Sequence, residues 1–333
     1  MKTNFKKLLY SGVTLMSIGI LVACSSTSSS MTTSSSAATS QSSASTTSSN
    51  STSSDSSSSS SSIDWSALPT TEVTLSNDGL KITEGGTYIL TGSTTAGVTV
   101  ETDANVRIIL AGAEISSSDT AAINVISADN VELELQDGTT NTVKDSSNHT
   151  DTNIEGAIHV EADLTITGNG SLTVEGNFQD GIVSTDDLVI DAGNITVTAV
   201  DDGIRGKDSL TINGGTITVT AGGDGIKSTN DTDTTKGYTT ITGGEITVKA
   251  GDDGIKAETA LTIDGGTITV SESAEALEGT NITINGGTID VTAQSAFDFD
   301  GTAELTGGTV TVNGEQITQI TATGPGAGGH GGW

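Results

Sequence analysis

A short phrase, Asp-Gly-Ile, recurs at a nearly fixed interval and limits the possible folds more than any other feature of this sequence. Its glycines are Gly181, Gly203, Gly225 and Gly254, and the first two intervals are 22 residues each. The third interval is 29 residues, which is one period plus a 7-residue insertion. A repeat of this length indicates a solenoid, because one unit is too short to bury an apolar face alone.

Each period has the same internal order of short apolar runs and turns. After Gly203 come Leu210 and Ile212, then a Gly-Gly pair, then Ile217 and Val219, with threonines between the apolar residues. This alternation buries one side of each short strand. Three strands and three turns in about 22 residues predict a right-handed, single-stranded parallel β-helix, which is an all-β fold. The hexapeptide period of a left-handed helix and the nonapeptide period of a calcium-binding roll are both missing.

Composition agrees with a solenoid once the period is known. Only 33% of the 333 residues are hydrophobic and 3% are aromatic, which without a period would indicate disorder. Columns of small β-branched residues are sufficient for a solenoid core. The formal net charge of −30 excludes attraction to nucleic acid or to anionic lipid and favours the binding of cations.

The N-terminal residues predict export and a lipid anchor. Residues 1–24 contain three lysines, an apolar run and then Leu21-Val22-Ala23-Cys24, which resembles the lipobox of bacterial lipoproteins. We expect Cys24 to be lipidated, with an ordinary secretory signal as the alternative. The protein would then be anchored at the outer face of the cell membrane and exposed at the cell surface, touching the membrane only through its lipid. Cys24 is the single cysteine, so a disulfide within the chain is impossible.

Three further segments complete the expected organisation. Residues 25–62 are serine or threonine at 31 of 38 positions and predict a disordered tether. Residues 63–320 form the β-helix domain, which we expect to be monomeric, and residues 321–333 are a glycine-rich tail without a core. The polar segment 144–155 is too long for a corner turn and should bulge from the solenoid, with His149 as a solvated loop residue.

Acidic and basic residues recur once per coil and should form two columns, because equivalent positions in successive coils lie about 4.8 Å apart. The basic column contains Arg205, Lys227 and Lys256 and ends at Glu278. The acidic column contains Asp180, Asp202, Asp224, Asp253 and Glu275, with Asp201 and Asp252 beside it. In one interpretation the aspartates brace the glycine corners and pair with the basic column. In the other they bind Ca²⁺ and leave the basic column to face an anionic ligand.

The insertion after Lys227 offers a second, weaker candidate site. Asp231 and Asp233 are spaced so that both carboxylates could face one hard cation, although a complete EF-hand loop is absent. Tyr238 follows the insertion and could stack on a sugar ring, or it could simply anchor the loop.

Several phrases resemble one known family. They are Asp201-Asp-Gly-Ile-Arg-Gly-Lys207, Gly222-Gly-Asp-Gly-Ile-Lys-Ser-Thr-Asn-Asp231, Lys236-Gly-Tyr238 and the repeated Ile-x-Gly-Gly-Thr-Ile-Thr-Val. Over roughly residues 70–315 the chain resembles the bacterial carbohydrate-binding β-helix family first described in a cellulolytic clostridium. The resemblance implies a pectate-lyase-like fold, calcium, and binding of polysaccharides such as polygalacturonate or cellulose. The Ala274-Glu275-Ala276 and Ala296-Phe297 phrases depart from the pattern, which puts a site in the last coils in doubt.

Three functions therefore remain at the level of sequence. The favoured one is a polysaccharide-binding surface that uses Ca²⁺ together with Arg205, Lys227, Lys256 and Tyr238. The second is a calcium-dependent polysaccharide lyase with Arg205 as the base. The third is a non-catalytic structural or adhesive surface protein.

Overall fold

The computed structural model describes residues 63–322. The expected signal peptide, the lipidation site at Cys24, the tether, and the tail from residue 323 lie outside the described residues. No helix in the described part of the chain is long and apolar enough to cross a membrane.

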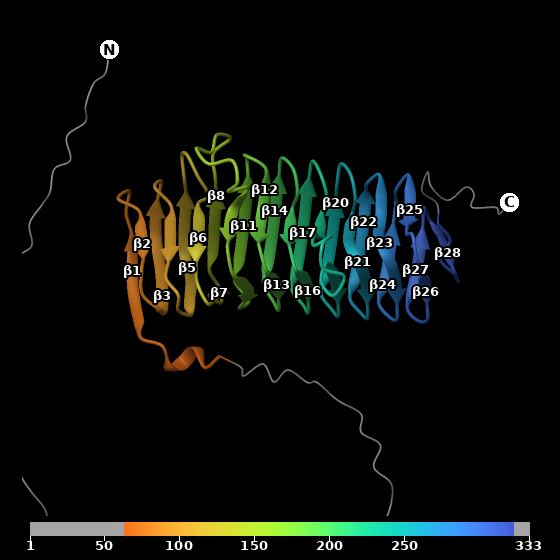
Figure 1. Cartoon of the computed structure of the whole chain (residues 1–333), viewed down its shortest axis with the longest axis horizontal. Coiled ribbons are helices and arrows are strands. Elements are labelled where there is room, and N and C mark those ends of the chain that lie inside the picture. The colour runs from red at the N-terminus through yellow and green to blue at the C-terminus, as the bar shows by residue number, and fades with distance from the viewer. Residues whose placement is uncertain (1–62, 323–333) are drawn as a thin grey trace, which may run out of the picture. The chain divides into compact units, whose positions relative to one another are not determined.

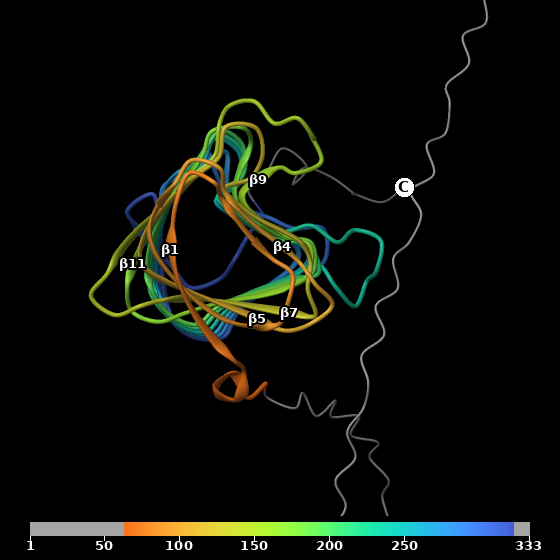
Figure 2. The same cartoon turned by 90° about the vertical axis from the view of Figure 1, so that its left-hand side faces the viewer.

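The described residues form one continuous sheet of 28 strands, wound into stacked coils (Figure 1) that have three faces when seen along the axis (Figure 2). The first face contains β2 (Leu80–Ile82), β4 (Val98–Glu101), β6 (Ile123–Ser127), β9 (Gly156–Val160), β12 (Asp180–Ser184), β15 (Ile204–Gly206), β18 (Ile226–Ser228), β25 (Ser295–Asp298) and the first halves of β21 (Ile255–Ile263) and β23 (Glu275–Ile284). The second face contains β1 (Thr70–Leu75), β7 (Asn130–Leu135), β10 (Asp163–Thr167), β13 (Asp187–Ile190), β16 (Ser209–Ile212), β19 (Tyr238–Ile241), β26 (Ala303–Leu305), the first parts of β3 (Gly86–Thr94) and β5 (Val106–Ser116), and the second halves of β21 and β23. The third face contains β8 (Thr140–Lys144), β11 (Ser171–Gly176), β14 (Asn194–Ala199), β17 (Thr216–Ala221), β20 (Glu245–Lys249), β22 (Thr267–Glu272), β24 (Thr288–Val291), β27 (Thr309–Val312), β28 (Glu315–Ile317) and the ends of β3 and β5.

Every pairing between coils is parallel. Seen from the N-terminal end in Figure 2, the chain passes clockwise from β4 to β5 to the face of β11 as it recedes, which is the sense of a right-handed helix. The predicted right-handed parallel β-helix is therefore confirmed.

The core consists of stacked aliphatic columns. Ile204, Ile226 and Ile255 are neighbours in successive coils of the first face, and each is 0% exposed. On the third face, strands such as β17 alternate exposed threonines with buried Ile217 and Val219, as the alternation predicts. Burial of each such side chain stabilises the fold by about 2 kcal/mol.

The recurring glycines meet two different backbone requirements. Gly215, Gly244 and Gly266 each stand second in a Gly-Gly turn with φ of +91°, +93° and +89°, a region that L residues rarely adopt. The glycine of the Asp-Gly-Ile phrase is required by space instead. A Cβ on Gly203 would lie 2.3 Å from Val219 Cγ1 and 2.5 Å from the carbonyl oxygen of Gly225.

The two ends of the solenoid differ from the coils between them. A 3₁₀ helix, η1 (Trp65–Ala67), precedes β1 at the start. At the other end Phe297 is 2% exposed and lies within the core. β27 and β28 form the one antiparallel pair among the described strands.

Two loops project beside the first face (Figure 2). One joins β8 to β9 through residues 145–155, where a bulge was predicted, and the other joins β18 to β19 through residues 229–237. They stand at opposite edges of this face, so the first face is the one that loops flank.

Candidate functional site

Aspartates form a ladder along the edge where the third face turns into the first. Oδ1 of Asp180 accepts the backbone N–H of Asp202 at 3.1 Å, and Oδ1 of Asp202 accepts that of Asp224 at 2.9 Å. Oδ1 of Asp224 in turn accepts the N–H of Asp253 at 2.9 Å. Each carboxylate therefore fastens its own coil to the next one, and the predicted stacking of these aspartates is confirmed.

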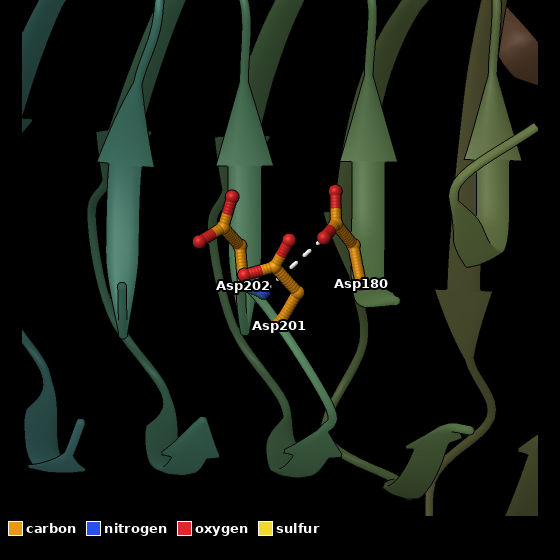
Figure 3. Close-up of side chains that lie close together, drawn as sticks. All are labelled: Asp180, Asp201 and Asp202. Atoms are coloured by element: carbon orange, nitrogen blue, oxygen red, sulfur yellow. Dashed lines mark hydrogen bonds between the residues drawn. The ribbon is translucent and has the colours of Figure 1, made fainter. Parts of the chain in front are cut away.

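Three aspartates gather at each of two places on this ladder. Asp180, Asp201 and Asp202 have carboxylate oxygens within 4.8 Å of one another, as Figure 3 shows. Asp224, Asp252 and Asp253 form a second such cluster. In both clusters one aspartate comes from one coil and two from the next, and only the first of those two, Asp201 or Asp252, is exposed.

The clusters repeat every second coil because an intervening coil carries glycine. Gly223 stands between Asp201 and Asp252, and a Cβ built on it would lie 2.5 Å from Asp201 Oδ1. A side chain at this position would therefore require the Asp201 carboxylate to move. Two coils correspond to roughly 10 Å along the axis.

The basic column lies on the first face directly beside the aspartates. Arg205, Lys227 and Lys256 are consecutive partners in the parallel ladder, and Glu278 follows them, as predicted. Lys227 Nζ lies 2.5 Å from Asp202 and 3.0 Å from Asp224, so one lysine bridges the two clusters. Lys256 Nζ lies 3.0 Å from both Asp253 and Glu278.

Arg205 is held in the same manner at the start of the column. Its guanidinium lies 2.9 Å from Asp180 and also contacts Glu155, at the end of the first loop. The three basic side chains are only 18–24% exposed. The interpretation in which the aspartates brace the corners and pair with the basic column therefore describes this geometry better than a basic column free to meet an anion.

Burial and charge pairing shift several pKa values at this edge. Burial raises the pKa of Asp180 to about 6, against the opposing effect of Arg205. Burial, with the nearby Glu278 carboxylate, raises the pKa of Asp253 to about 7 even though Lys256 opposes the shift. One lysine cannot neutralise two carboxylates, so Asp253 and Glu278 together hold a proton more tightly than an isolated aspartate does.

The cations respond in the opposite direction. Burial by itself would lower the pKa of Arg205, but Asp180 and Glu155 outweigh it and raise that pKa. The pKa of Lys227 is likewise raised by Asp202 and Asp224 against its burial. Both side chains stay charged at neutral pH.

The residues predicted in the second loop do not join this site. Asp233 Oδ1 accepts hydrogen bonds from the backbone N–H of Thr235 at 3.0 Å and from its hydroxyl at 2.7 Å, which is a local turn. Asp231 is exposed, and neither residue belongs to the two clusters. Tyr238 is 39% exposed but begins β19 on the second face, next to the loop and away from the basic column.

Sequence reasoning missed two participants from the first loop. Glu155 contacts Arg205, and His149 is buried at 9% exposure, so the prediction of a solvated His149 was wrong. His149 packs on Phe178 with ring centroids 4.3 Å apart. A signal was available in Phe178, because an aromatic residue just before the Asp-Gly-Ile phrase occurs in this coil alone.

Comparison with known proteins places the chain in a family. A family model described as carbohydrate-binding domain-containing protein matches residues 76–318. The chain belongs to that family. The resemblance inferred from the Asp-Gly-Ile phrases is thus confirmed.

Two relatives illustrate the family. A carbohydrate-binding domain-containing protein of Acetivibrio thermocellus is 35% identical over 135 residues, which are 38% of this chain and 47% of the relative. The chain thus spans about half the length of this curated relative. A solved structure described as a polysaccharide lyase-like protein from C. thermocellum, a gadolinium derivative, superposes with a TM-score of 0.59 at 31% identity. That likeness covers 71% of this chain and 98% of the other.

Proposed function

We propose that this family member is a polysaccharide-binding module that acts with Ca²⁺ on its first face. The observation that carries the proposal is the pair of three-aspartate clusters, spaced two coils apart along one flanked face. Hard cations prefer oxygen ligands from carboxylates, backbone carbonyls and water.

The donor set fits a divalent cation on charge as well as on chemistry. Six aspartates line this edge, and two lysines and one arginine balance three of their charges. Asp201 and Asp252 are exposed and in contact with no cation at hydrogen-bonding distance among the described residues. We assign Asp201 with Asp180 and Asp202 to one ion, and Asp252 with Asp224 and Asp253 to the other.

Ca²⁺ would supply the positive charge that an acidic polysaccharide needs. The basic column is already bound to carboxylates, so it offers little free charge to a uronate chain. A bound ion that keeps some coordination positions for the ligand would bridge protein and sugar. We therefore propose polygalacturonate-like chains as ligands, with a neutral cellulose-like chain as the alternative.

Binding is favoured over catalysis by the state of Arg205. A lyase base must be able to lose its proton, yet Asp180 and Glu155 raise the pKa of this guanidinium and hold it in place. Arg205 is therefore a poor candidate for the base of a lyase.

Calorimetry with Ca²⁺ and polygalacturonate tests the proposal. We expect the wild type to bind Ca²⁺ first and the polysaccharide only in its presence, without release of unsaturated product in an absorbance assay. Asp201→Asn combined with Asp252→Asn should abolish both, whereas Asp290→Asn, which removes an exposed carboxylate on the third face, should change neither. Polysaccharide binding that is equally tight in EDTA would contradict the role of Ca²⁺.

We also propose that the module is held at the cell surface through a lipid on Cys24, with residues 25–62 as a spacer. The lipobox-like Leu21-Val22-Ala23-Cys24 supports this placement. Cys24→Ala should move the protein from the membrane fraction to the medium. Retention of the variant in the membrane fraction would contradict a lipid anchor.

A further inference from the structure

The first loop projects beside the coils of the first face that come just before Arg205. In β15 and β18 the outward residue, Arg205 or Lys227, is partly exposed. The two preceding positions of the same column are His159 and Val183, and these are only 3% and 2% exposed. All five residues of β9 and of β12 are buried. The column is therefore accessible from Arg205 onward, closed at Val183, His159 and Asn124, and at least partly exposed again at Thr99 and Lys81.

Contacts from three coils hold the loop in place. The backbone N–H of Thr150 donates to the carbonyl oxygen of Asp119 at 2.8 Å, and the Ser146 hydroxyl donates to that of Ser118 at 2.7 Å. At its far end Glu155 contacts Arg205. These contacts are on the surface, whereas the centre of the loop is held by a buried pair.

That pair is Asp145 and His149, whose side chains are both 0% exposed. Nδ1 of His149 lies 2.6 Å from the carbonyl oxygen of Ile154, and Nε2 lies 3.0 Å from Asp145 Oδ2. Among the described residues neither Nε2 nor Oδ2 has a hydrogen-bond partner apart from this close approach. Oδ1 of Asp145 accepts the backbone N–H of Asn177 at 2.5 Å, which ties the loop to the next coil.

The contacts of His149 and Asp145 require one more proton than a neutral imidazole and an ionised carboxylate carry together. A carbonyl oxygen only accepts, so Nδ1 must carry a hydrogen. If Nε2 and the carboxylate were both unprotonated, two lone pairs would face each other across 3.0 Å in a dry site. Moving the hydrogen to Nε2 would only transfer the repulsion to the carbonyl oxygen of Ile154. The closed loop therefore holds a proton between His149 and Asp145, on one or the other.

We propose that residues 145–155 are a pH-sensitive latch over the first face, closed by the proton held between Asp145 and His149 and released when that proton is lost. Release would add the positions of His159 and Val183 to the accessible column. That the enlarged face serves a polysaccharide rests on the proposed function, whereas the latch itself does not.

The other titratable and charged groups around this pair are engaged elsewhere, exposed or neutral. Lys144 is paired with Glu175 at 2.7 Å, and Glu155 with Arg205. Asp151 is exposed and accepts from Asn153. Burial lowers the pKa of His159 to about 4, so it stays neutral beneath the loop.

The direction of the pH dependence follows from the proton count. Loss of the proton would set two lone pairs against each other in the closed loop but not in the open one, so the closed loop binds the proton more tightly than the open loop does. The stability of closure is complete at low pH and is lost as the pH rises through the apparent pKa of the pair. Loss of a single proton limits the change to tenfold in the closing equilibrium for each pH unit.

Hydrogen exchange of the full chain, measured by mass spectrometry without ligand and corrected for the intrinsic exchange rate, tests the latch. Between about pH 5 and about pH 9, protection of residues 145–155 should fall by up to tenfold per unit above the apparent pKa. Protection of β14 on the third face should stay constant and serves as the internal reference. Constant protection of the loop in the wild type would overturn the proposal.

Asp145→Asn provides the matched variant. Its amide oxygen can still accept from Asn177, and its N–H replaces the titrating proton by donating to Nε2 of neutral His149. We expect the loop of this variant to stay protected at every pH, whereas Asp151→Asn, in the same loop, should behave as the wild type. A loop that opens with pH in Asp145→Asn as it does in the wild type, or one that is unprotected even at low pH, would contradict the latch.

Discussion

The central coils and the last coils of the first face share one backbone ladder but present opposite chemistry. In register, Ile226 and Ile255 are followed by Leu277 and then Phe297, so the inward column stays apolar to the end. The outward column instead changes sign, since Lys256 is followed by Glu278 and Asp298. The inward residues set the fold, and the outward residues can change without disturbing it.

The central coils and the last coils also differ at the corner that carries the Asp-Gly-Ile phrase. Gly254 has its counterpart in Ala276, and both clusters of three aspartates found in the described residues lie in the central coils. The expectation that the last coils depart from the pattern is therefore supported by the positions of the clusters. The comparison can be tested at the inward column, at the glycine corner, at the carboxylates and at the cations.

The largest effect is expected at the inward column. Ile226→Asp places a charge in a site that is 0% exposed, with no partner to pair with it. The free energy of unfolding should fall by about 4 kcal/mol or more. Thr218→Asp, on an exposed position of the third face, should cost less than about 1 kcal/mol. Equal losses in denaturant unfolding would show that the inward and outward columns are not distinct.

The glycine corner should show the next largest effect. In Gly254→Ala the new Cβ would lie 2.6 Å from the carbonyl oxygen of Ala276 and 2.7 Å from Val270 Cγ1. We expect a loss of about 3 kcal/mol in the free energy of unfolding, typical of an overpacked core. Ala276→Gly, one coil later, should cost only about 1 kcal/mol. If Gly254→Ala proves neutral in thermal unfolding, close approach does not explain the repeated glycine.

The carboxylates should make stability depend on pH and on Ca²⁺. The folded-state pKa values of Asp180 and Asp253, about 6 and about 7, are above the unfolded value, so protonation stabilises the fold. This stabilisation is complete below about pH 4 and is lost as the pH rises through the folded-state values, with a change on the order of 2 kcal/mol after solvent screening. Melting temperatures measured in EDTA should therefore decrease as the pH rises from about 4 through these folded-state pKa values.

The double variant Asp180→Asn, Asp253→Asn is the control for that pH series. In this variant the melting temperature should depend less on pH. In the wild type, millimolar Ca²⁺ should have the same effect, because the ion would take the place of the lost protons. A wild-type decline that persists unchanged in the double variant would assign the pH dependence to other groups, such as the Asp145 and His149 pair.

The smallest effect is expected at the cations. Lys227→Met removes the bridge between Asp202 and Asp224 and should lower the free energy of unfolding by about 1 kcal/mol. Lys249→Met removes a pair with Glu272 in which both side chains are more than half exposed, and it should be neutral. If the two variants are equally stable in denaturant unfolding, the ion pairs of the half-buried Lys227 stabilise the fold no more than the exposed pair of Lys249 does.

The sequence predicted the fold and the columns because both depend on the period alone. Once the Asp-Gly-Ile phrases are spaced by one coil, parallel pairing must stack Asp180 on Asp202 and Arg205 on Lys227. The period does not determine where a side chain points within its coil. The closing of Lys227 onto two carboxylates therefore had to come from the structure.

The first loop could not be predicted for a related reason. Its conformation depends on Ser118 and Asp119 from the preceding coil and on Asn177 and Phe178 from the next. Phe178 is unusual at its place in the repeat and marks this coil, but no spacing indicates that these residues meet His149. The insertion after Lys227 was similarly undetermined, and Asp233 caps a local turn there.

Gly223 bears on how many coils separate one aspartate cluster from the next. The coil between Asp201 and Asp252 carries Gly223 at their position, so the clusters along this edge have a period of two coils, although the fold has a period of one. Duplication of a single coil in such a chain would lengthen the core but leave a cluster incomplete. Insertion of coils in pairs would add complete clusters. Relatives with more coils should therefore have one additional cluster for every two additional coils.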